Sequence, residues 1–324
     1  MRKLLLLALS AAGVFTLQAR QLTPAEALAR VTGVTAPSRS GDVSLVYTSD
    51  DSASGQAGVY VFNRGTDNGF LIVSADDAAE ALLGYADGGS FDPADMPPAL
   101  RAWIEEYTRQ VAWASTSSAP SRAASAGRPA RASIAPMCKT QWNQSAPYND
   151  LCPTTEGSRC VTGCVATAMA QVMKYHNYPT KGVGSHSYTT PSLFLSASFN
   201  FGATTFDWAN MLDSYTSTST ATQKTAVATL MLAAGVSVDM DYTPSSSGAS
   251  VFAPGQALIE YFNYDKGITY QSRSWYGLYD WEDLIYDNLK TCGPVILGGQ
   301  SGEGGHEFVC DGYSKDGYFH INWG

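Results

Sequence analysis

The pattern of apolar and polar positions divides the chain into two folded regions. In the first, Thr23 and Pro24 are typical of a helix start, and the apolar spacing predicts a helix over Pro24–Val31. A second helix is predicted from Pro97-Pro98 onward. Short apolar or alternating runs predict three strands, over Val43–Thr48, Gly58–Phe62 and Phe70–Ser74. The turn residues 63–69 join the last two strands as a hairpin. The sequence therefore predicts a small α+β domain over residues 20–114.

The segment 115–135 has a different composition. It consists mainly of Ser, Ala, Gly, Pro and Arg, with Arg122, Arg128 and Arg131 and no acidic residue. Such a segment buries too little apolar surface to order itself. We expect a flexible linker that proteases cut, with a passive tether as the alternative.

In the second region, residues 136–324, the spacing of apolar residues changes partway along the chain. Its first half predicts helices over Cys164–His176, Thr222–Ala234 with Gly235 at its end, Pro254–Phe262, and a fourth segment that Asp280 caps and Gly293-Pro294 ends. After residue 294 the spacing becomes that of strands, over Val295–Leu297, His306–Asp311 and Tyr318–Trp323. The expected fold is α+β, with a helical half and an antiparallel sheet half.

The N-terminus indicates export. Arg2 and Lys3 precede the apolar run Leu4–Leu17, which is typical of a secretory signal peptide over residues 1–19. The run is short for a membrane span, and an uncleaved anchor is the alternative. A formal net charge of -9 argues against nucleic acid and anionic membrane surfaces as partners. We expect a secreted protein with no membrane association after signal removal.

Cys164 is the first candidate for chemistry. It follows Gly163 and begins the predicted helix, where unpaired backbone N–H groups and the helix dipole favour a thiolate. Without that context, a free cysteine is usually a small buried apolar residue. Cys164 is therefore predicted to be a nucleophile with a pKa below that of a free thiol.

Elimination among the four histidines selects His306 as the general base. His176 lies on the same predicted helix, roughly 18 Å along its axis from the nucleophile. His186 stands in a polar segment where a solvated side chain is expected, and His320 in a strand where a structural role is expected. His306 opens a strand after several glycines.

Three further residues complete the predicted site. Asn322, with Trp323 beside it, follows on the next strand, where its carbonyl accepts the imidazole N–H and the indole shields that bond. The alternative is an asparagine at a strand end beside a core tryptophan. An oxyanion needs donors, and the Cys164 N–H with a side-chain amide, Gln144 or Gln141, would supply them.

The remaining chemistry is sparse. Six cysteines leave five after the nucleophile, so they do not all pair internally, and Cys152 with Cys160 is a candidate disulfide. No zinc spacing is present, so no metal and no cofactor are expected.

The residues around these candidates resemble the streptopain family of cysteine peptidases in the papain-like superfamily. The similar segments are Trp142-Asn143-Gln144, Pro147-Tyr148-Asn149, 162–168, 174–179, 235–242, Gly305-His306 and Asn322-Trp323-Gly324. Residues 75–77, 83–85 and Pro97-Pro98 before Trp103 are similar to the family's inhibitor-like propeptide.

The resemblance implies a papain-like, two-lobed catalytic domain and a secreted zymogen that hydrolyses peptide bonds of protein substrates. It assigns Cys164 as nucleophile, His306 as base and acid, and Gln144 as oxyanion donor, with Asn322 and Trp323 in support. Less specifically, Ser247 and Gly305 would contact substrate, although a solvated surface loop is an equally good interpretation of 245–250.

Under this interpretation, the prodomain is an intramolecular inhibitor. Because the family continues beyond Trp-Gly, the catalytic domain is expected to be incomplete at Gly324. The alternatives are an inactive homologue that acts as an inhibitor or binding module, and another Cys–His acyltransferase.

Overall fold

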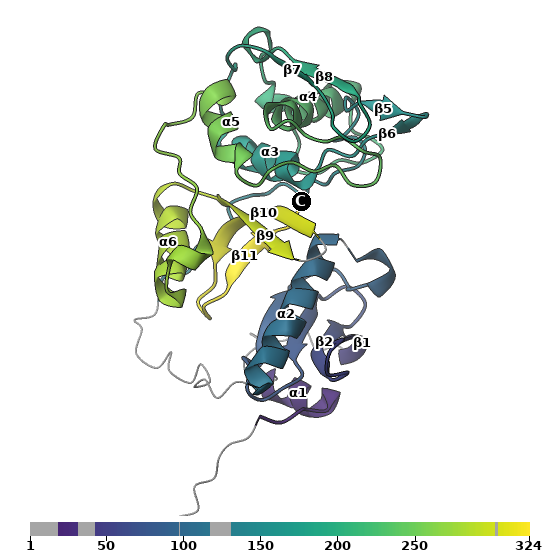
Figure 1. The fold of residues 1–324 in the computed structure, drawn as a ribbon, viewed down its shortest axis with the longest axis vertical. Coiled ribbons are helices and arrows are strands. Elements are labelled where there is room, and N and C mark those ends of the chain that lie inside the picture. The colour runs from purple at the N-terminus through teal and green to yellow at the C-terminus, as the bar shows by residue number, and fades with distance from the viewer. Residues whose placement is uncertain (1–18, 32–42, 97, 117–130, 302–303) are drawn as a thin grey trace, which may run out of the picture. The chain divides into compact units, whose positions relative to one another are not determined.

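The computed structural model describes residues 19–31, 43–96, 98–116, 131–301 and 304–324. Their contacts divide the chain into two compact units, Met1–Arg128 and Pro129–Gly324, which are described separately here (Figure 1). Almost all of the predicted signal peptide, and residues 117–130 of the predicted linker, lie outside the described residues. Among the described residues, no helix has the length and apolar character needed to cross a membrane.

The first unit combines two helices with a four-stranded antiparallel sheet. The helices are α1 (Pro24–Val31) and α2 (Pro98–Thr116). The sheet has the order β1-β2-β3-β4, with β1 Val43–Asp50, β2 Ala57–Arg64, β3 Phe70–Ser74 and β4 Leu82–Ala86. The predicted α+β organisation is confirmed, and β4 is an addition that sequence reasoning missed.

Helix α1 begins where its sequence signals indicate. The Glu26 N–H donates to Thr23 Oγ1 at 3.3 Å, and the Thr23 N–H donates to the Glu26 carboxylate at 2.8 Å. This reciprocal pair satisfies two backbone donors at the helix start.

The core of the first unit lies between the sheet and α2. Val59, Val61 and Ile72 of the sheet cluster with Ile104 of α2. At Gly58 a Cβ would lie 2.8 Å from the Thr108 Cα, so only glycine permits this close approach of strand and helix.

The second unit has a mainly helical part, drawn in teal and green in Figure 1. It contains α3 (Cys164–His176), α4 (Ala221–Ser237) and α5 (Ala253–Phe262). Two small hairpins accompany them: β5 Thr154–Thr155 with β6 Ser158–Arg159, and β7 His186–Thr189 with β8 Ser196–Phe199. Short 3-10 turns occur at Phe201–Ala203, Trp208–Asn210 and Arg273–Trp275, and in the first unit at Pro93–Asp95.

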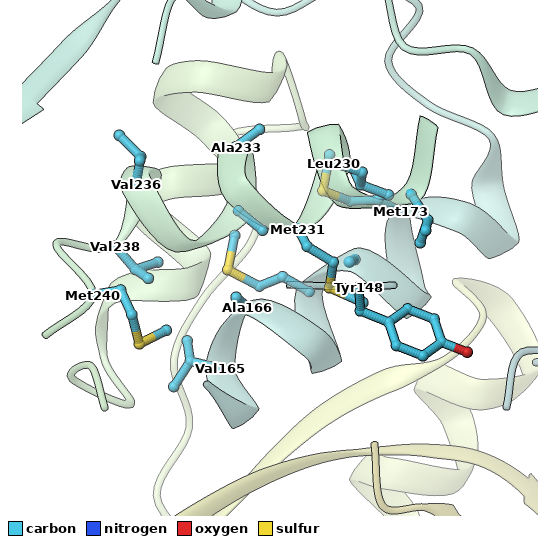
Figure 2. Close-up of a cluster of buried hydrophobic side chains, with 14 of the residues drawn as sticks. Tyr148, Val165, Ala166, Met173, Leu230, Met231, Ala233, Val236, Val238 and Met240 are labelled. Carbon is cyan, nitrogen blue, oxygen red and sulfur yellow. The ribbon is translucent and has the colours of Figure 1, made fainter. Parts of the chain in front are cut away.

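Helix α3 forms the centre of this part. All nine residues from Val165 to Met173 are buried, so this part of the helix is enclosed on every side. The two polar residues among them, Thr167 and Gln171, have hydrogen-bond partners at Thr162 and Thr140. Figure 2 shows Ala166 and Met173 of α3 beside Met231 and Leu230 of α4, within the same buried cluster as Val165. This packing fixes the position of the first residue of α3, Cys164.

Helix α4 extends past its predicted end. Gly235 does not terminate it, because the helix continues to Ser237. A Cβ at Gly235 would lie 2.1 Å from the hydroxyl oxygen of the buried Tyr242, so this glycine makes room for a core tyrosine.

The sheet part follows in the chain. Strands β9 (Val295–Ser301), β10 (Gly304–Tyr313) and β11 (Phe319–Asn322) form an antiparallel sheet of order β11-β10-β9, and α6 (Leu278–Thr291) packs against it. Asp280 does not cap α6: Gly277 is the N-cap and Asp280 lies in the first turn. On the helical side, α3 packs against β10 through Ala168, Val172 and Val309.

The end of the predicted linker belongs to the second unit. Ile134 exchanges two backbone hydrogen bonds with Tyr313, each 2.8 Å long. The Tyr286 hydroxyl donates to the Ala132 carbonyl at 2.9 Å, and Arg131 forms an ion pair with Asp283. Residues 131–135 are therefore ordered by contacts with α6 and β10, in contrast to the expected flexible segment.

Candidate active site

Cys164 occupies the first position of α3, as predicted. Gly163 precedes it with φ 84°, a conformation that strongly favours glycine. A Cβ at this position would lie 2.5 Å from Met240 Sδ and 3.1 Å from the Ser247 carbonyl oxygen. The turn into α3 therefore depends on a glycine that is packed closely on both sides.

The Cys164 thiol lies against β10, where the backbone N–H of Glu307 interacts with it. This contact places the sulfur at the residue that directly follows His306. Burial is the largest influence on Cys164 and raises the pKa of its thiol, outweighing the backbone N–H groups, which lower it. The expected lowering of the pKa is therefore absent from this structure.

His306 is held by a backbone carbonyl. Its Nε2 lies 3.0 Å from the Trp323 carbonyl oxygen, so Nε2 carries the proton and Nδ1 is left to exchange a proton. The rings of Phe308 and Trp323 lie 6.1 and 6.4 Å from the imidazole. Burial is the main influence on His306 and lowers its pKa, so this structure favours a neutral thiol and a neutral imidazole.

Asn322 does not make the predicted bond to the histidine. Its Nδ2 donates to the Thr140 carbonyl at 2.8 Å, and its Oδ1 accepts the Gly324 N–H at 3.3 Å. The reason lies in the strand register, which pairs Asn322 with Val309, three residues beyond His306. Trp323, the next residue, supplies its backbone carbonyl instead.

Gln144 lies close to the start of α3. Its carbonyl accepts the Thr162 N–H at 3.1 Å, which ties it to a residue two positions before Cys164. Gln144 is half-buried, whereas Gln141 is exposed and its N–H bonds the Asp213 carbonyl at 2.7 Å. Of the two amides left open by the sequence, this geometry favours Gln144.

The two residues suggested for substrate contact differ in their surroundings. Gly305 is exposed and pairs with Gln300 of β9. Ser247 is buried, and its hydroxyl donates to the Val161 carbonyl at 2.7 Å and accepts the Thr243 N–H at 3.0 Å. The Ser247 hydroxyl therefore holds its own loop against the segment before Gly163, and the suggested contact of Ser247 with substrate stays a prediction.

The other histidines have local partners. His186 was expected to be solvated, but its Nε2 lies 2.7 Å from Asp239 Oδ1 and its ring stacks on Tyr188. His320 Nδ1 lies 2.5 Å from Oδ1 of the fully buried Asp311, which fits the expected structural role.

The cysteines outside the site are unpaired. Cys152 and Cys160 are buried free thiols, so the candidate disulfide is absent from this structure. Within the described ranges, no group of three or more His, Cys, Asp or Glu side chains is placed to hold a metal ion.

Glu307 is the residue that sequence reasoning missed. Its side chain is 3% exposed and its Oε2 has no hydrogen-bond partner. Burial raises the pKa of its carboxyl to about 8. An acidic residue directly after the candidate base and before the apolar run Phe308-Val309-Cys310 was the available signal.

A helix that begins at a cysteine and packs on a sheet that carries a histidine defines a papain-like cysteine peptidase. Solved structures of interpain A from Prevotella intermedia agree with this fold. A cysteine-to-alanine mutant of prointerpain A superposes with a TM-score of 0.72 at 33% identity, covering 87% of this chain and 88% of that one. The active wild-type interpain A superposes with a TM-score of 0.56 at 39% identity, covering 59% and 82%.

Sequence comparisons give the same result. Residues 142–324 match the model of the Peptidase C10 family, and residues 9–111 match that of the Spi protease inhibitor. Streptopain of Streptococcus pyogenes is 36% identical over 290 residues, which cover 82% of this chain and 71% of streptopain. The thiol protease/hemagglutinin PrtT of Porphyromonas gingivalis is 36% identical over 280 residues, but the aligned region is about a third (32%) of its length.

The chain therefore belongs to the Peptidase C10 family. Its N-terminal unit is an inhibitor-like propeptide domain, and the predicted fold class is confirmed.

Proposed function

We propose that this chain is the zymogen of a secreted cysteine endopeptidase that hydrolyses peptide bonds in protein substrates. The observation that carries the proposal is the packing of α3, whose first residue is Cys164, against β10, the strand that carries His306. Membership in a peptidase family and the inhibitor-like N-terminal unit support it.

In the proposed reaction, His306 Nδ1 takes the proton of Cys164, and the sulfur attacks the carbonyl carbon of the scissile bond. The Cys164 N–H and the Gln144 side chain stabilise the oxyanion. His306 then protonates the leaving amine, and a thioester remains on Cys164. Water, activated by the same imidazole, hydrolyses the thioester and restores the thiol.

Trp323 orients the base in this proposal. Its carbonyl accepts the Nε2 proton, which fixes the tautomer with a free Nδ1 and stabilises the imidazolium that forms during the reaction. Asn322 supports this arrangement indirectly, because it fixes the end of β11 to Thr140.

We further infer that the N-terminal unit restrains activity until the linker is cut. The test is to incubate the purified full chain, measure its cleavage of casein, and sequence the N-termini that appear. Cys164→Ala should remain a precursor and cleave no casein, whereas Cys292→Ala, which removes an exposed thiol, should behave as wild type. Equal conversion and cleavage by wild type and Cys164→Ala would refute the proposal.

A further inference from the structure

The side chain of Thr162, two residues before Cys164, is bound to helix α3. Thr162 and Thr167 are both fully buried, and their hydroxyl oxygens lie 2.9 Å apart. The Thr167 hydroxyl donates its single proton to the Gly163 carbonyl at 3.0 Å, so the proton between the two hydroxyls comes from Thr162. Because Thr167 belongs to the buried run of α3, it gives Thr162 a rigidly held acceptor.

The backbone of Thr162 binds the candidate oxyanion donor. Its N–H donates to the Gln144 carbonyl at 3.1 Å. Gln144 lies outside the helices and strands, at the beginning of a turn segment, so its position relative to α3 depends on bonds of this kind. Thr162 therefore joins the two parts of the proposed oxyanion site. Its side chain holds the helix that carries the Cys164 N–H, and its backbone holds the residue that carries the amide.

The peptide group between Val161 and Thr162 is held at its other end as well. The Ser247 hydroxyl donates to the Val161 carbonyl at 2.7 Å, and the N–H of the same peptide group is the one that binds Gln144. Ser247 thus fixes the direction in which this N–H points, whereas the contact with Thr167 fixes its distance from α3. Without the Thr162 hydroxyl, the peptide group and Gln144 can move together relative to the helix.

We propose that Thr162 is a positioning residue for the oxyanion site. Its hydroxyl bond to Thr167 sets the distance between the Gln144 side chain and the Cys164 N–H. This inference rests on the proposed function, because it concerns the oxyanion formed in that reaction.

The expected effect falls on the chemical step. Removing one oxyanion donor outright costs about 100- to 1000-fold in kcat, so displacing a donor that is still present should cost a part of that, about tenfold. The donors act on a charge that develops only in the transition state, so KM should stay the same.

The test compares kcat and KM for a peptide substrate, with converted enzyme prepared from each full-length variant. Thr162→Val keeps the branched shape but loses the hydroxyl, and its kcat should fall about tenfold with KM unchanged. Thr162→Ser retains a hydroxyl and should keep the wild-type kcat. Thr190→Val is the matched control, because Thr190 is equally buried and its hydroxyl accepts the Leu195 N–H at 2.9 Å. It should also keep the wild-type kcat.

Two further measurements separate positioning from a general loss of structure. In a Gln144→Ala background, Thr162→Val should lower kcat by less than about twofold, because the donor that it displaces is already missing. Iodoacetamide loses iodide from a methylene carbon and forms no oxyanion. The rate at which it alkylates Cys164, followed by mass spectrometry of that peptide, should therefore be the same in Thr162→Val and wild type.

An unchanged kcat in Thr162→Val would overturn the inference. It would also be overturned by a tenfold fall that persists in the Gln144→Ala background, or by an equally large fall in the alkylation rate of Cys164. If Thr162→Val does not fold, Thr167→Val removes the same hydroxyl contact from the side of α3 and carries the same test. Each of these negative results leaves the proposed function standing. Failure of the proposed function would appear separately, as unimpaired casein cleavage by Cys164→Ala.

Discussion

Replacing Asn322 by alanine separates two possible roles of this side chain. If the Trp323 carbonyl orients His306, the Asn322 amide contributes mainly to stability. It donates to the Thr140 carbonyl at 2.8 Å and accepts the Gly324 N–H at 3.3 Å. Asn322→Ala removes both bonds and leaves the 3.0 Å contact between His306 and Trp323 in place.

The expected magnitudes differ clearly between the two roles. Loss of two half-buried hydrogen bonds should lower the free energy of unfolding by about 1–2 kcal/mol. For a unit of this size that is a fall in Tm of about 3–6 °C. The kcat/KM value should fall less than about tenfold. Removing a side chain that orients a catalytic histidine would instead cost about a hundredfold or more.

The assay combines peptide-substrate kinetics of the converted enzyme with thermal unfolding of the full chain. Asn210→Ala is a suitable control, because the Asn210 amide bonds the Asp207 carboxylate within its own turn at 2.7 Å. A hundredfold or larger fall in kcat/KM for Asn322→Ala, with unchanged Tm, would refute the reasoning and return the orienting role to Asn322.

Two further predictions concern stability. Gly163→Ala introduces a Cβ at φ 84° and 2.5 Å from a methionine sulfur, and should lower the free energy of unfolding by about 2–4 kcal/mol. Gly157→Ala, at φ 79° with open space around it, should lose only about 1–2 kcal/mol in urea titrations, and equal losses would count against a packing constraint at Gly163. For Glu307, the folded-state pKa is raised from 4.5 to about 8, so between these values the folded state binds more protons than the unfolded state. Its contribution should therefore lower stability as pH rises from 4.5 to 8, by at most about 5 kcal/mol, and Glu307→Gln should remove that slope. Parallel pH dependences of wild type and Glu307→Gln in urea unfolding would show the argument to be wrong.

Much of the fold was predictable because local signals and packing agree. The first residue of α3 was predicted correctly, since Gly163 breaks the preceding segment and a continuous buried run follows. Helix α1 and strand β3 also have their predicted bounds. The hairpin β7–β8 was missed, because each strand has only four residues and half of them are Ser or Thr. Its apolar face consists of Tyr188, Ala197 and Phe199, which is too short a pattern to recognise in the sequence.

The site divides in the same way. The sequence by itself determined Cys164 and His306 as candidates, because the start of a helix and the start of a strand can both be recognised from neighbouring residues in the sequence. Only the tertiary structure decided what holds the imidazole, because the acceptor is the Trp323 backbone carbonyl, and every residue has a backbone carbonyl. The surroundings of Glu307 were likewise decided by packing. Its burial depends on α3, β9 and β10 together. Because these segments are distant from one another in the sequence, the residues next to Glu307 do not predict that its carboxyl is shielded from water.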